Sequence, residues 1–166
     1  MEAAAENPGG ARDRRDLGSA RLAFRAWETP MADQIRRVDY YYVEIPDKPG
    51  EGVRVLAALK EGGVNLLNFT AFPGAGGKAQ LDLVVEDSGA LAKAAKGAGL
   101  TLSAKKQAFY IQGQNRAGAA ADVLRKLADA KVNVRASNGS AGQGGFGMIV
   151  WVAPSDYAAA AKALGV

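Results

Sequence analysis

The chain of 166 residues contains no cysteine and no histidine. These absences exclude a cysteine nucleophile, a Ser–His pair and any metal site built from thiolates or imidazoles. The sequence also lacks the Asp-rich loop that is typical of calcium sites, so we expect neither a metal nor a cofactor. No nucleophile–base pair is evident among the remaining polar residues, and the sequence therefore predicts a protein that is not an enzyme.

Long apolar runs are absent as well. No segment approaches the ~18 apolar residues that a membrane helix requires. The first 15 residues carry charges of both signs and lack the apolar core of a secretory signal, so we expect a cytoplasmic protein without membrane contacts. The net charge is +4, but the lysines and arginines are scattered along the chain, which disfavours nucleic acid as a partner.

Residues 1–36 differ in composition from the rest of the chain. Alanine, glycine and charged residues dominate them, and no strand or helix period emerges. This composition predicts a disordered or loosely attached N-terminal extension. We expect that deletion of residues 1–30 leaves the melting temperature nearly unchanged.

An internal repeat organises the remainder of the chain. Residues 38–98 match residues 106–166 at a constant offset of 68 residues, without a gap. The matched pairs are Gly50 with Gly118, Asn65 with Asn133, Gly74 with Gly142, Gly77 with Gly145, and Val84 with Val152. A repeat of this kind predicts two similar structural units, here residues 37–105 and 106–166.

Each copy has the pattern strand–helix–strand–strand–helix. Alternating and β-branched segments predict strands over 38–45, 64–72 and 81–86, and over 109–112, 132–139 and 146–153. Helical spacing predicts that the first helix of each copy buries Val53, Leu56 and Leu59, or Ala121, Leu124, Leu127 and Ala128. Ser88 and Ser155 are expected to cap the second helices.

A closing strand is predicted at 100–104 in the first copy only. The predicted fold class is therefore α+β. It consists of tandem ferredoxin-like βαββαβ modules, with helices on one face and antiparallel sheets that pair side by side. The second module lacks its last strand, and its edge is left to another segment, to another chain or to solvent.

The loops before and after the first helices carry a family resemblance. Asp47-Lys48-Pro49-Gly50 precedes the helix of the first copy, and Gly63-Val64-Asn65 follows it. This pattern resembles the ACT domain family, which consists of βαββαβ modules that bind amino acids and regulate metabolic enzymes. The second copy keeps Asn115-Arg116-Ala117-Gly118 and Val132-Asn133, with alanine in place of proline and Lys131 in place of glycine.

The resemblance implies a regulatory protein without catalytic activity that senses a free amino acid. It also implies a homo-oligomer and a regulated metabolic enzyme as partners. The ligand would lie between the helix-start loop of one module and the second strand of the other. Two pockets follow, one formed by Asp47, Lys48, Pro49 and Gly50 with Asn133, the other by Asn115, Arg116 and Gly118 with Asn65.

Physical chemistry is compatible with both pockets. A helix N-terminus offers unpaired N–H groups to a carboxylate, and a glycine lets a ligand approach the backbone. Asp47 or Asn115 could accept hydrogen bonds from the ligand ammonium, and the asparagine amides could complete the site. The same residues are also favoured helix caps and turn formers, so a scaffold or assembly module without a ligand remains an alternative.

Two further motifs offer other functions. Residues 145–151 are similar to the third-strand signature of RNA-recognition motifs, in which Tyr110 and Phe146 would stack on the bases of single-stranded RNA. Residues 142–147 spell G-x-G-x-x-G, the pattern of a dinucleotide site. Because this glycine run lies between two predicted strands and not between a strand and a helix, a hairpin is the better interpretation.

Overall fold

The computed structural model describes residues 33–166. The first 32 residues of the predicted N-terminal extension lie outside this part of the chain. Its last residues, 34–36, belong to the first strand, which begins at Gln34 and not at Val38.

Both copies have the predicted order of elements. The first copy contains β1 (Gln34–Pro46), α1 (Glu51–Glu61), β2 (Leu66–Pro73), β3 (Lys78–Val85) and α2 (Ser88–Gly97). The second contains β4 (Lys106–Gly113), α3 (Ala119–Asp129), β5 (Val134–Gly142), β6 (Gly145–Val152), the 3₁₀ turn η1 (Pro154–Asp156) and α4 (Tyr157–Leu164). None of the helices within residues 33–166 combines the length and apolar character needed to cross a membrane.

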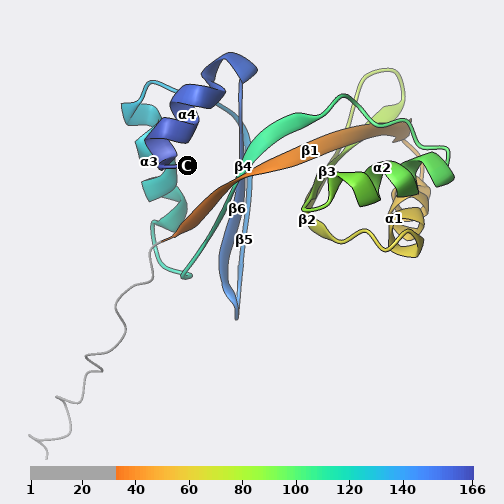
Figure 1. Ribbon diagram of the computed structural model, residues 1–166, viewed down its shortest axis with the longest axis horizontal. Helices are drawn as coiled ribbons and strands as arrows, with labels where there is room; N and C mark the ends of the chain where they lie inside the picture. The colour runs from red at the N-terminus through yellow and green to blue at the C-terminus, as the bar shows by residue number, and fades with distance from the viewer. Residues whose placement is uncertain (1–32) are drawn as a thin grey trace, which may run out of the picture. The chain divides into compact units, whose positions relative to one another are not determined.

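One antiparallel sheet holds the six strands of residues 33–166, in the order β2-β3-β1-β4-β6-β5. The long strand β1 pairs with β4 over Gln34–Tyr40 and with β3 over Asp39–Pro46. Figure 1 shows β1 running from the α3 and α4 pair to the α1 and α2 pair. Each of the two central strands is therefore the first strand of its own module and the closing strand of the other module.

This sharing corrects the predicted strand at 100–104. Residues 100–105 contain no strand, and the closing position of the first module is occupied by β4. The segment still runs beside β1, because Ser103 N–H donates to Tyr42 O (2.9 Å). The ladder is interrupted there because Tyr42 N–H donates to the Ser103 hydroxyl (3.0 Å) and not to a backbone carbonyl. In the same way, the N-terminal half of β1 takes the place of the last strand that the second module was predicted to lack.

The four α-helices of the described part of the chain cover one face of the sheet, as predicted. Val43 and Ile45 of β1 belong to the core beneath α1 and α2. Ile35, on the same face of the same strand, packs against the core beneath α3 and α4. Alternate residues of a strand face opposite sides of the sheet. Because positions 35, 43 and 45 are separated by even numbers of residues, they face the same side, and both helix pairs therefore lie on that side.

The helix-free face has a core of its own. It consists of Val38, Val84, Ala108, Ile149 and Trp151, and all five are buried although none of the helices in residues 33–166 covers them. The sheet curls around this cluster until its two edge strands meet, where Asn138 Nδ2 of β5 donates to Thr70 Oγ1 of β2 (3.1 Å). Below, this cluster is called the seam core.

The ungapped repeat ends at the hairpins. Tyr41 pairs with Leu83, and its equivalent Phe109 pairs with Val150, so the offset falls from 68 to 67 residues after the turn. The second hairpin is one residue shorter, and Val84 corresponds to Trp151 and not to Val152. A slip of one residue exchanges the two faces of a strand, and the hydrogen-bond register therefore decides this assignment.

The predicted helix faces also need correction. Helix α1 buries Val55 and Leu59, whereas Val53 is 72 % exposed. Helix α3 buries Val123 and Leu127, and the predicted Ala121 and Ala128 are exposed. A spacing of four residues keeps side chains on one narrow stripe, whereas repeated steps of three rotate away from it. The predicted caps were each off by one residue, because α2 and α4 are preceded by Asp87 and Asp156.

Candidate functional site

The helix-start loops contain two glycines with left-handed backbone. Gly50 precedes α1 with φ 91°, and Gly118 precedes α3 with φ 84°. L-residues rarely adopt these angles, so the turn by itself accounts for glycine at both positions. The geometry thus agrees with the scaffold interpretation of these glycines and leaves their approach to a ligand as a proposal.

Within one chain, the structure does not bring together the two predicted sets of ligand residues. Asn65 and Asn133 lie just before the edge strands β2 and β5. At this end of the sheet, the residues that pair across the central strands β1 and β4 are Asp39 and Gln107, and we measure along the strands from this row. The loop of Asp47 lies past the far end of β1, and that of Asn115 past the far end of β4. At about 3.4 Å per residue, each loop is roughly 25 Å along the strands from that row.

The loop of the first module is joined to its own hairpin. Asp47 N–H donates to Gly77 O (2.9 Å), and Lys48 N–H donates to Pro46 O (2.9 Å). Pro49 and Gly50 then lead directly into α1. The backbone of the first loop is therefore held in place without a ligand.

The second loop is organised by ion pairs. Arg116 Nη1 is paired with the Asp122 carboxylate, and Arg116 Nη2 lies 3.4 Å from Asp33 Oδ2. The hydrogen bond that Arg116 donates to the Asp122 carboxylate raises the pKa of Arg116. The guanidinium is thus engaged by two carboxylates of its own chain.

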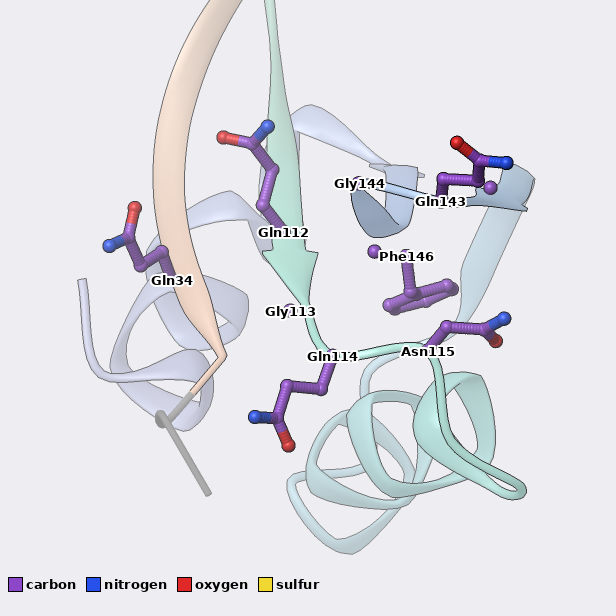
Figure 2. Close-up of a pocket in the computed structure, with 10 residues that line it drawn as sticks. Gln34, Gln112, Gly113, Gln114, Asn115, Gln143, Gly144 and Phe146 are labelled. Atoms are coloured by element: carbon purple, nitrogen blue, oxygen red, sulfur yellow. The ribbon is translucent and has the colours of Figure 1, made fainter. Parts of the chain in front are cut away.

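A cavity of about 580 Å³ lies between the second loop and the second hairpin. Its lining comprises Gln34, Gln112, Gly113, Gln114, Asn115, Gly142, Gln143, Gly144, Gly145 and Phe146. Figure 2 shows the Phe146 ring between the hairpin and Asn115, with Gln34 and Gln112 on the adjoining strands. Strand register explains this last pair, since Gln34 and Gln112 are direct cross-strand neighbours.

Glycine at the hairpin end of the cavity permits a close approach of two backbone segments. A Cβ on Gly145 (φ 124°) would lie 2.5 Å from Gly113 O, so a larger residue cannot occupy this position without displacing the loop. Of the predicted site residues, only Asn115 lines the cavity. The glycine run at 142–147 was the sequence signal for the hairpin side of the cavity. Gln34 was missed because residues 1–36 were assigned to the N-terminal extension.

The RNA-recognition alternative requires two stacking rings on one face of the sheet. Tyr110 packs at the seam core on the helix-free face. Phe146 packs against the core beneath α3 and α4, on the opposite face. The two rings therefore cannot form one stacking platform. The G-x-G-x-x-G run is the β5–β6 hairpin, as predicted.

Comparisons with known proteins identify the fold. No model of a protein family matches the chain, and no curated protein matches it. Among solved structures, protein BT0572 from Bacteroides thetaiotaomicron is similar with a TM-score of 0.67 and 19 % identity, over 79 % of this chain and 88 % of that one.

Two regulatory subunits of aspartate kinase are similar as well. The ligand-free subunit from Thermus thermophilus has a TM-score of 0.58 and 17 % identity, over 82 % of this chain and 96 % of that one. The subunit from Thermus flavus has a TM-score of 0.51 and 20 % identity, over 82 % and 95 %. The chain thus has an α+β, ACT-like fold with tandem ferredoxin-like modules.

Proposed function

We propose that this protein is a non-catalytic regulatory module that binds a free amino acid. The observation that carries the proposal is the cavity at the start of α3, lined by Asn115 and bounded by the glycine hairpin. Its volume lies within the range of small-molecule sites, about 300–1,000 Å³. The similarity to regulatory subunits of aspartate kinase supports a regulatory role within this fold.

Binding would act on the contacts between loop and hairpin. In the first module this contact is closed by the bond between Asp47 and Gly77. A ligand that bridges Asn115 and the second hairpin would close the equivalent contact in the second module. The closed state would then be passed to a regulated enzyme, or to another copy of the chain, as a shift in a conformational or assembly equilibrium.

Thermal unfolding of the full chain with each of the twenty amino acids tests this function. A ligand at ~100 times its dissociation constant adds about 2.7 kcal/mol to the free energy of unfolding. For a chain of this size that corresponds to a rise of roughly 5–10 °C in the melting temperature. Sedimentation velocity with and without the active amino acid would then show whether binding changes the assembly state.

Three asparagine variants locate the site. Asn115→Ala should abolish the shift, whereas Asn65→Ala and Asn133→Ala should preserve it. Loss of the shift in Asn65→Ala instead would favour a composite pocket formed between two chains. If no amino acid shifts the melting temperature, the sensor function is refuted and an assembly module without a ligand is favoured.

A further inference from the structure

Among residues 33–166, the lining of the second-module cavity includes no ionisable side chain. Its polar groups are the amides of Gln34, Gln112, Gln114, Asn115 and Gln143, and its other residues are glycines and Phe146. The nearby charges of Asp33, Arg116 and Asp122 are paired with one another. The first loop carries the charged Asp47 where the second loop has the neutral Asn115, whereas Lys48 and Arg116 are cations at equivalent positions.

The backbone of the loop offers a second kind of neutral group. In the first module, Asp47 N–H is bound to the hairpin. Asn115 occupies the same position in the second module. Among the backbone hydrogen bonds of turns and loops within residues 33–166, none is donated by the Asn115 N–H. Backbone N–H groups can hold the α-carboxylate that every free amino acid shares, so selection among amino acids falls to the side-chain amides.

These amides restrict the ligand side chain. A charged side chain would lose part of its hydration without meeting an opposite charge. An apolar side chain would displace water from these exposed amides without replacing its hydrogen bonds, which costs affinity. A carboxamide presents one acceptor and an NH₂ donor group, and each glutamine or asparagine of the lining can pair with both.

We propose that the cavity between the α3 loop and the β5–β6 hairpin selects an amino acid with a carboxamide side chain, glutamine or asparagine, over charged and apolar amino acids. This inference rests on the proposed function and specifies its ligand class. Phe146 could cover the methylene groups of such a ligand, and Gln112 on β4 and Gln143 on the β5–β6 hairpin supply amides from two different elements of the lining (Figure 2).

Isothermal titration of the full chain with glutamine, asparagine, glutamate, aspartate and leucine tests the selection. One of the two carboxamides should bind at least tenfold more tightly than its isosteric acid, a difference of about 1.4 kcal/mol. Gln112→Ala and Gln143→Ala should each weaken that binding about fivefold or more. Gln107→Ala removes an exposed amide outside the cavity and should leave the affinity unchanged.

A charge variant makes the test stricter. Gln112→Arg places a cation in the cavity and should reverse the preference from carboxamide to acid. If glutamate, aspartate or leucine binds to the unaltered protein as tightly as glutamine and asparagine, the selection is overturned while the sensor function stands. Carboxamide binding that is insensitive to both alanine variants overturns the assignment to this cavity. Absence of any amino-acid binding refutes the proposed function itself.

Discussion

Replacing Leu59 by alanine tests whether the shared strands β1 and β4 join both modules into one unfolding unit. Leu59 of α1 is 1 % exposed in the core of the first module. Loss of such a leucine costs about 2–5 kcal/mol, because burial is lost and a cavity remains. At about 3 kcal/mol and a urea dependence of about 2 kcal/mol per molar, the unfolding midpoint falls by about 1.5 M.

The effect should extend to the second module. Unfolding of the first module withdraws β1 from β4, removes Ile35 from the core beneath α3 and α4, and opens the seam core around Trp151. Far-UV circular dichroism and Trp151 fluorescence, measured in a Trp27→Phe background, should therefore share the lowered midpoint. Leu127→Ala, at 0 % exposure in the other core, should act in the same manner.

A biphasic curve would contradict this reasoning. If part of the helical signal in Leu59→Ala unfolds at the midpoint of the unaltered protein, the modules are independent and the shared strands do not couple them. Val53→Ala serves as the matched control on the same helix, because Val53 is 72 % exposed.

Three further outcomes follow from the structure. Asn138→Ala should lower the free energy of unfolding by about 1 kcal/mol, and a double-mutant cycle with Thr70→Ala should assign that loss to their bond, with additivity as the contrary result. Burial raises the pKa of the Asp82 carboxyl, against the opposing hydrogen bond from Gln80 and the charge of Lys106. The pKa of Asp82 is therefore higher in the folded than in the unfolded state. As the pH rises from the unfolded-state pKa through the folded-state pKa, ionisation of Asp82 lowers the free energy of unfolding. Asp82→Asn should therefore gain stability relative to the unaltered protein between pH 3 and pH 7 in urea titrations, and a constant difference across that range would count against it. Val55→Ala should cost about 2 kcal/mol, whereas Val53→Ala should change stability by less than about 0.5 kcal/mol, and equal costs would restore the helix face predicted from sequence.

Local patterns predicted most of the secondary structure correctly. The aromatic and β-branched segment at 38–45 lies within β1, and the glycine clusters after β2 and β5 are hairpins. The buried face of α1 was predicted wrongly because two valines fit a helical spacing relative to Leu59. Val53 fits steps of three residues, and Val55 fits a step of four, which is the one that the helix buries. The place of Asn115 in a loop before α3 was predicted, but its neighbours across the cavity were not.

What the sequence determined by itself is the internal repeat, the α+β class and the positions of the two hairpin turns, because these depend on side-chain period and on glycine within a few residues. Three features were decided only by the tertiary structure. They are the exchange of closing strands between the modules, the one-residue shift of the second hairpin, and the amide-lined cavity that joins Gln34 to Gln143. Each depends on pairing between residues far apart in the chain, and such pairing is selected by the cooperative packing of the whole sheet and by no local pattern.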